Sequence, residues 1–312
     1  DALMLEGNLL RYSITSDATR VQARTLPALP GVEIDGSALA LSATPCADWD
    51  DDWLPPTVSQ PEPGRWRIAL AGAFARDCAA QARLQLLDRS VAAERLVRAV
   101  WAGLGGTWRQ PLGAVHEAAT PAGSLRIAQH ESRPWGEVLR SMNKSSDNPI
   151  SRLLYLQLGV AAMADDASTS TLDLARREVE RWFDAKRIAR DGLVMDNGSG
   201  LSRSERIAPR TMAHMIDAAL RGPYAPEMLM SLPLAGVDGT MRRRLKGTRA
   251  EAWARLKTGT LRNVAALAGI VRDTRGDDWV VVAIINHDDA LKGRPALDAL
   301  IEWIADSGAR WR

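Results

Sequence analysis

The sequence is poor in the residues that bind metal ions or cross-link a chain. Its 312 residues include two cysteines and four histidines, which are scattered along the chain. Metal sites usually need more such ligands at closer spacing. We therefore expect neither a metal ion nor another cofactor.

Long apolar runs and strong net charge are also lacking. No stretch approaches the roughly 20 apolar residues that span a bilayer, so we expect no transmembrane segment. No basic segment followed by an apolar segment opens the chain, so no signal peptide is visible. The net charge is +2 and no Lys/Arg cluster carries interleaved aromatic residues, which argues against a nucleic-acid partner. The basic run Arg242–Arg244 is interpreted as a solvated surface.

The remaining composition is typical of a soluble globular protein, with 46% hydrophobic and 25% charged residues. Up to about Ala80, short β-like segments alternate with turns rich in Pro and Gly, whereas helical periodicity begins at Val91. We therefore predict a β-rich region over residues 1–88 and a second domain over residues 89–312. The predicted strands of the first region are 9–15, 32–43 and 65–72, with a long loop over 48–64.

The second domain is predicted to contain helices followed by a sheet. Helical periodicity covers residues 91–105, 148–159, 170–186 and 208–222, and another helix is expected to end near Arg140. Asn148 stands at a capping position, and Gly159 at a stop position. Strands over 252–260, 264–273 and 279–287 precede a final helix over 294–308. This order predicts an α+β fold in which helices flank an antiparallel sheet.

A polar run, SMNKSSDNPI at residues 141–150, raises the question of an active site. Ser141 and Lys144 have the spacing of a serine nucleophile and its lysine base. Ser146-Asp147-Asn148 precedes a predicted helix, and simple helix capping would explain Ser146 and Asn148. Lys257-Thr258-Gly259 closes a predicted strand, where a lysine can also serve only to guard a sheet edge. Each three-residue pattern alone is weak evidence.

Together and in this order, the two patterns match the S-D-N and K-T-G elements of the penicillin-recognising serine enzymes. Longer stretches are more specific, namely MNKSSDNPISRLLYLQLG, MDNGSGLSRSERIAP, LPLAGVDGTMRRRL and LKTGTLRNVAALAGIV. They closely resemble the D-alanyl-D-alanine carboxypeptidase/endopeptidase family of low-molecular-mass, class C penicillin-binding proteins. The resemblance runs from about Leu104 to Trp303. It implies the transpeptidase-like fold of penicillin-binding proteins and serine β-lactamases, with residues 1–88 as the remnant of an inserted domain.

The same resemblance implies a periplasmic hydrolase that acts on peptidoglycan stem peptides and is acylated by β-lactams. It removes the terminal D-alanine or cuts D-alanyl cross-links. By similarity, the Ser146 hydroxyl would relay a proton, Asn148 would hold the substrate amide, and Lys257 would face the substrate carboxylate. The substrate-binding residues would be Thr258, Gly259 and Thr260, where relatives often carry serine at the last position. Ser199 and Arg203 would line the cleft without a catalytic role.

The nucleophile of this family belongs to an S-x-x-K motif that we expect upstream of Asp1. Ser141 is not expected to replace it, because it lies on the same segment as S-D-N and cannot face it across a cleft. Two other functions stay open. A β-lactamase shares the motifs and differs in rapid deacylation, and a binding module without a nucleophile would recognise D-alanyl peptides without cutting them.

Cys46 and Cys78 are either two unrelated buried thiols or one disulfide. Cys46 precedes a Pro-rich loop, and Cys78 follows the predicted strand 65–72, so the pair could join neighbouring strands. The periplasmic location that the resemblance implies favours the disulfide.

Overall fold

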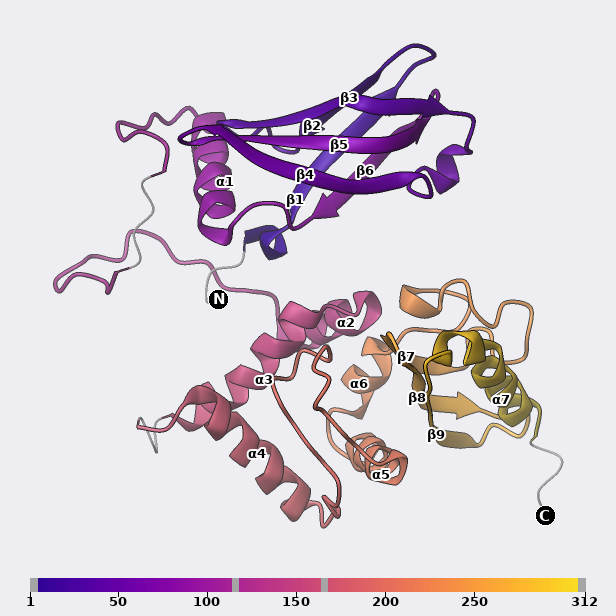
Figure 1. The fold of residues 1–312 in the computed structure, drawn as a ribbon. Coiled ribbons are helices and arrows are strands. Elements are labelled where there is room, and N and C mark those ends of the chain that lie inside the picture. Colours follow the sequence, from indigo (N-terminus) through magenta and orange to yellow (C-terminus); the bar gives the residue numbers. More distant parts are fainter. Residues whose placement is uncertain (1–4, 114–117, 164–167, 308–312) are drawn as a thin grey trace. The chain divides into compact units, whose positions relative to one another are not determined.

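The computed structural model describes residues 5–113, 118–163 and 168–307. The chain divides into two compact units, residues 1–127 and residues 128–312. Figure 1 labels the helices and strands of both. Each unit has its own hydrophobic core and is described by itself.

Unit 1 contains two three-stranded sheets. The first has the order β2-β1-β6 and is antiparallel, with β1 at Leu10–Ser16, β2 at Val21–Thr25 and β6 at Ala79–Leu84. The second has the order β3-β5-β4, with β3 at Val32–Ser42, β4 at Trp53–Glu62 and β5 at Arg65–Ala75. In the second sheet β5 runs parallel to β3 and antiparallel to β4 (Figure 1).

The three strands predicted in this region are confirmed as β1, β3 and β5. The prediction of a long loop over 48–64 is wrong, because β4 occupies most of it. Pro55 and Pro56 lie where the pairing with β5 shifts register between Leu54 and Thr57. Proline is tolerated at such an irregularity and on an edge strand, and β4 is an edge strand.

The core of unit 1 lies around β1 and β5 and buries Tyr12, Ile14, Ile68 and Phe74. Cys78 belongs to the same core, and the structure joins it to Cys46 through a disulfide with a Cα–Cα distance of 5.4 Å. The bond connects the chain just after β3 to the chain just before β6.

Helix α1, Arg89–Gly103, belongs to unit 1. Asp88 caps its first turn, and Val91 and Ala92 pack against the core formed by the strands. The predicted boundary between residues 88 and 89 therefore differs from the structural division between residues 127 and 128. The change from strand to helix periodicity marks a new element on the same core, not the start of a new compact unit.

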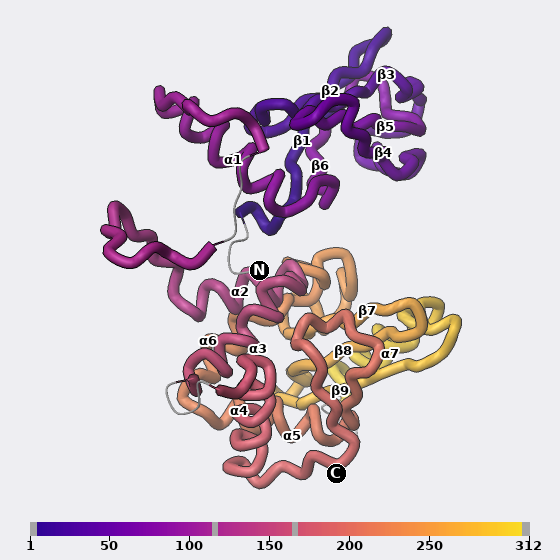
Figure 2. Tube along the Cα trace, turned by 60° about the vertical axis from the view of Figure 1, so that its left-hand side comes forward, coloured from indigo at the N-terminus to yellow at the C-terminus, as the bar shows by residue number. Residues whose placement is uncertain are grey.

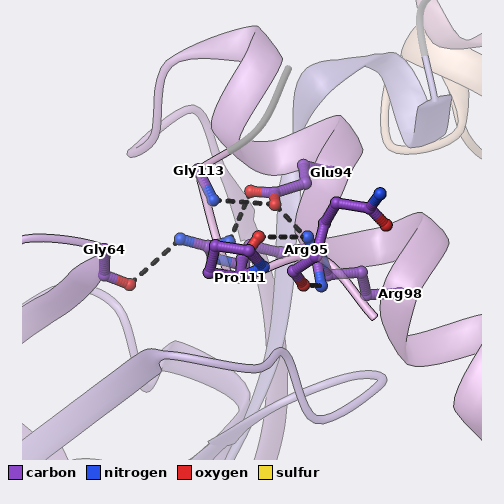
Figure 3. A network of polar contacts seen from close by, with 7 residues as sticks. Gly64, Glu94, Arg95, Arg98, Pro111 and Gly113 are labelled. Carbon is purple, nitrogen blue, oxygen red and sulfur yellow. Dashed lines mark hydrogen bonds and ion pairs between the residues drawn. The ribbon is translucent and has the colours of Figure 1, made fainter. Parts of the chain in front are cut away.

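A buried group of charges ties α1 to the loop that follows it (Figure 3). Glu94 accepts hydrogen bonds from Arg95, Arg98 and the Gly113 amide. Arg95 also donates to the Gly64 carbonyl in the turn between β4 and β5, at 3.0 Å. Both guanidinium groups are nine-tenths buried or more, and one carboxylate compensates them.

Unit 2 contains an antiparallel sheet with the order β7-β8-β9, formed by Arg255–Leu261, Val264–Arg272 and Asp278–Asn286. Its helices are α2 at Trp135–Ser145, α3 at Asn148–Ala162, α4 at Thr171–Ala185, α5 at Pro209–Leu220, α6 at Ala225–Ser231 and α7 at Arg294–Asp306. The three predicted strands and the predicted helices are confirmed (Figures 1 and 2). The last predicted residue of the final helix, Gly308, lies outside the described residues.

Alternation along β8 explains why helices cover both faces of the sheet. Leu267 and Val271 face one side and pack with Ile301 of α7. Ile270 faces the other side and packs with Ile216 of α5. Successive strand residues point to opposite faces, so an almost continuously apolar strand indicates burial on both sides.

The segment between α2 and α3 corrects three predicted details. Helix α2 continues past Arg140 to Ser145. The capping residue of α3 is Asp147, whose carboxylate accepts from the Ile150 amide, whereas Asn148 is already in the first turn. Helix α3 does not stop at Gly159, where a Cβ would meet the Thr171 carbonyl of α4 at 2.0 Å. Gly159 therefore permits close helix packing.

Candidate active site

Ser146 forms the junction between α2 and α3. Its backbone has φ 58° and ψ 49°, in the left-handed region, and its amide closes α2 by donating to the Met142 carbonyl. Glycine or asparagine usually occupies such a position, because other residues are strained there. A serine at this place suggests that its hydroxyl is needed.

The Ser146 hydroxyl accepts a hydrogen bond from Lys257 of β7, with 2.8 Å between Nζ and Oγ. Lys257 also donates to the Thr258 carbonyl at 2.9 Å. Burial lowers the pKa of Lys257, because the charged ammonium loses water contacts. No carboxylate neutralises this ammonium among the hydrogen bonds and ion pairs of the described residues. The site therefore presents a partly desolvated positive charge.

A loop between α4 and α5 closes one side of the site. Asn148 donates to the Ser199 carbonyl at 2.6 Å, and Ser151 donates to the Gly198 carbonyl at 2.7 Å. Gly198 has φ 70°, and a Cβ there would meet the Tyr155 ring at under 3 Å. Side chains in the first turn of α3 thus hold the DNGSG segment, residues 196–200, through hydrogen bonds to its backbone carbonyls.

The hydroxyl groups after Lys257 have partners beyond the strand. Thr258 donates to the Thr240 hydroxyl at 2.9 Å, and Arg294 at the start of α7 donates to the Thr260 hydroxyl at 3.2 Å. Gly259 lies opposite Ala266 of β8, and a Cβ on it would come within 3.3 Å of the Ala266 side chain. Hydroxyl groups therefore follow Lys257 along the strand, and Gly259 places no side chain between them.

Strand β7 also offers backbone groups at the sheet edge. The Leu256 amide donates to the Pro233 carbonyl, away from β8. Because successive strand residues alternate in direction, the backbone groups of Thr258 and Thr260 face the same outer edge. Past Leu256, this edge borders the site and can pair with an extended peptide.

These groups surround a cavity of about 420 Å³ within unit 2. Of the predicted site residues, it brings together Ser146, Asn148, Lys257, Thr258, Gly259, Thr260 and Ser199. Arg203 does not line it, and its side chain is exposed.

Sequence reasoning missed several lining residues. Thr240 comes from the 3-10 turn Gly239–Met241, while Asn143 and Ser151 flank the S-D-N segment. Arg294, which donates to Thr260, was also missed. Thr240 lies in a stretch that carries the family resemblance, but no short motif in that stretch assigns it a role.

The S-x-x-K spacing at residues 141–144 does not form a nucleophile with its base. The Lys144 ammonium donates to both oxygens of Asp238, at 2.7 and 2.8 Å, and to the Leu232 carbonyl at 2.7 Å. Its donors are committed to these partners, and Ser141 does not line the cavity that holds Lys257. This geometry supports the interpretation of the spacing as coincidence.

A larger cavity of about 840 Å³ lies among α3, α4 and α5, with a mainly apolar lining that also includes Glu178 and Arg181. It lacks the convergent polar groups of the site around Lys257. Within residues 5–113, 118–163 and 168–307, no His, Cys, Asp and Glu side chains gather in threes as a metal site would require. Over the same ranges, no helix is both long and apolar enough to cross a membrane.

Comparison with known proteins adds independent information. Residues 45–307 match the D-Ala-D-Ala carboxypeptidase 3 (S13) family. A D-alanyl-D-alanine carboxypeptidase from an Actinomadura species is 30% identical over 226 residues, which are 70% of this chain and 41% of that protein. The D-alanyl-D-alanine carboxypeptidase DacB of Haemophilus influenzae is 30% identical over 162 residues, which are 51% of this chain and 33% of that protein. The chain thus spans about two fifths or less of the length of these curated relatives.

Solved structures agree on the fold. The crystal structure of penicillin binding protein 4 from Haemophilus influenzae superposes with a TM-score of 0.65 at 21% identity, covering 95% of this chain and 67% of that one. The same protein complexed with a β-lactam gives a TM-score of 0.62 at 20% identity. The predicted fold class, that of penicillin-binding proteins, is confirmed.

Proposed function

Because the chain belongs to the D-Ala-D-Ala carboxypeptidase 3 (S13) family, we propose that the cavity around Lys257 is part of a serine peptidase site. Its substrates are peptidoglycan stem peptides that end in, or are cross-linked through, D-alanine. Curated relatives carry the carboxypeptidase name, and a β-lactam complex is known for a protein of the same fold. A cell-wall substrate implies work outside the cytoplasm, in the periplasm.

The observation that carries this proposal is the contact between Lys257 and Ser146. It joins the K-T-G strand to the S-D-N junction at 2.8 Å and leaves a partly buried ammonium that no carboxylate of the described residues engages. A carboxylate at the end of a D-alanyl peptide would supply the missing negative charge. The hydroxyl groups of Thr258 and Thr260 lie on the same strand and can donate to that carboxylate.

In the proposed reaction, a serine oxygen attacks the carbonyl carbon of the scissile D-alanyl bond. The serine proton passes to a lysine base and, through the Ser146 hydroxyl, to the leaving nitrogen as the C–N bond breaks. The outward Thr260 amide on the β7 edge can donate to the oxyanion. Water then hydrolyses the ester. A β-lactam acylates the same serine as its ring C–N bond breaks, and the resulting ester is hydrolysed slowly.

The attacking serine is not supplied by Ser141, because Lys144 is held by Asp238. We propose that an S-x-x-K segment other than residues 141–144 provides it. The 312 residues by themselves are then expected to bind D-alanyl peptides without acylation. Intact mass after incubation with a fluorescent penicillin checks this, and an adduct on Ser141 would overturn the assignment.

Binding by the 312-residue chain tests the role of Lys257. A peptide ending in D-Ala-D-Ala should bind Lys257→Gln about ten- to a hundredfold more weakly than wild type, because a charge-assisted hydrogen bond contributes roughly 1.5–3 kcal/mol. Isothermal titration calorimetry measures this. Lys292→Gln is the matched control, because it removes an exposed ammonium that pairs with Asp289 outside the cavity.

The pH profile separates a charge role from a packing role. Burial lowers the pKa of Lys257, so its ammonium is lost at lower pH than that of an exposed lysine. At pH values above about 5, where the peptide carboxylate is ionised, wild-type affinity should be constant up to that pKa and fall as the pH rises through it, whereas Lys257→Gln should give a flat profile over the same range. Wild-type affinity retained by Lys257→Gln, or by a peptide with an amidated carboxyl end, would refute the proposed function.

A further inference from the structure

A second, open pocket of about 650 Å³ adjoins the cavity around Lys257. Ser141, Lys144 and Ser145 at the end of α2 line it on one side, and residues 239, 240, 242 and 243 line it on the other. We call it the basic pocket. Thr240 lines both the basic pocket and the cavity, so the two are contiguous across one side chain.

The basic pocket carries positive charge that the described residues do not neutralise. Arg242 and Arg243 are exposed, and among the described residues no hydrogen bond or ion pair engages either guanidinium group. Arg244, the third residue of the run, instead pairs with Asp298 at 2.7 Å. The nearby Asp238 is already bound by Lys144. Two of the three arginines are therefore available to a ligand.

The position of the basic pocket assigns it to one end of the substrate. Thr240 accepts a hydrogen bond from Thr258, which lies in the K-T-G strand beside the proposed carboxylate site. In the proposed reaction that carboxylate belongs to the leaving group. The basic pocket therefore begins where a leaving D-alanine ends, and this step rests on the proposed function.

We propose that the basic pocket is a leaving-group subsite for acidic peptides. A free terminal D-alanine has no atoms beyond its carboxylate and cannot reach Arg242 or Arg243. In a cross-linked peptide, the leaving amine belongs to the side chain of a second stem peptide, which continues past that carboxylate and bears further carboxylates. Guanidinium groups bind carboxylates through paired hydrogen bonds. The site is thus adapted to cut cross-links between stem peptides.

Three synthetic peptides test this with the 312-residue chain. The first ends in D-Ala-D-Ala. The second carries the same acyl half linked to the side-chain amine of a diamino acid within an acidic peptide, and the third is the second with its additional carboxylates amidated. Calorimetry compares the wild type, Arg242→Gln/Arg243→Gln, Lys257→Gln and the control Arg187→Gln/Arg210→Gln. The control also removes two exposed positive charges, but outside both pockets.

The wild type and the control should bind the acidic cross-linked peptide about tenfold more tightly than its amidated form, as two solvent-facing ion pairs allow. Arg242→Gln/Arg243→Gln should lose this preference and bind the D-Ala-D-Ala peptide within about twofold of wild type. If that variant keeps the preference while Lys257→Gln still weakens all three peptides, the subsite is refuted and the proposed function stands. If Lys257→Gln binds all three like wild type, the proposed function fails and the subsite with it.

Discussion

Replacing Asp238 by asparagine tests how the S-D-N junction is held in place. Asp238 accepts two hydrogen bonds from Lys144 near the end of α2 and a third from the Leu234 amide. Breaking a fully buried pair costs roughly 3–5 kcal/mol, whereas an exposed pair contributes about 0.2–1 kcal/mol. The Lys144 and Asp238 side chains are 16% and 36% exposed. We therefore expect a local cost near 2 kcal/mol, between the two limits.

Hydrogen exchange measured by mass spectrometry reports this cost where it arises. The Ser146 and Asp147 amides both donate to the Met142 carbonyl, so opening of the end of α2 exposes them. A cost of about 2 kcal/mol corresponds to roughly 30-fold faster exchange in a peptide covering residues 140–147. Asp298 of α7 forms a comparable pair with Arg244. Asp298→Asn breaks that pair and should leave the exchange rate of the 140–147 peptide unchanged.

The pKa of Asp238 determines how the exchange rate of the same peptide should change with pH. Burial alone would raise the pKa of Asp238, but the hydrogen bonds from Lys144 and Leu234 outweigh it and lower that pKa. The protection that wild type has over Asp238→Asn should therefore persist at neutral pH and disappear as the pH falls through the lowered pKa. Exchange in Asp238→Asn within about threefold of wild type at pH 7 would mean that the ion pair does not hold the junction.

Two further predictions concern unit 1. Glu94→Gln leaves two buried guanidinium groups uncompensated and should lower the free energy of unfolding by roughly 3–5 kcal/mol in urea unfolding. The control is Glu62→Gln, which breaks an exposed pair with Arg65 and should cost less than about 1 kcal/mol. Equal losses for the two variants would contradict the role of burial. The Cys46–Cys78 bond closes a loop with a sequence separation of 32 and should contribute roughly 3–4 kcal/mol by the chain-entropy model. Mass spectrometry of a non-reduced digest checks the bond, and two alkylatable thiols would exclude it.

Local periodicity was enough to predict most elements of unit 2. Strand β8 is a short, almost continuously apolar run and helix α7 has apolar residues at helical spacing, and one face of β8 packs against α7. Strand β4 could not be found in this way. Most of its residues are exposed, and prolines interrupt it, so only its pairing with β5 defines it as a strand. The predicted boundary differs from the division into compact units for a related reason, since Val91 packs against the core that the strands form.

The site divides in the same way. Ser146 and Lys257 could be predicted because short motifs mark them, although 111 residues separate the two. Thr240 and Arg294 carry no motif that assigns them a role. Thr240 contacts Thr258 because the 3-10 turn lies beside β7, and Arg294 contacts Thr260 because the first turn of α7 also lies beside β7. Such contacts depend on tertiary structure, and no pattern along the chain contains them.

The polar run that suggested both a helix cap and an active site contains a helix cap and side chains that line the candidate site, and the left-handed turn at Ser146 allows both. Lys144 and Asp147 lie on either side of it and have structural partners, one in Asp238 and the other in the first turn of α3. Ser146 and Asn148 both face the cavity. A helix continuing through residue 146 would change these directions. The left-handed backbone at Ser146 therefore separates the anchoring side chains from those that line the cavity, and we expect the Lys144–Asp238 pair to keep that turn in place.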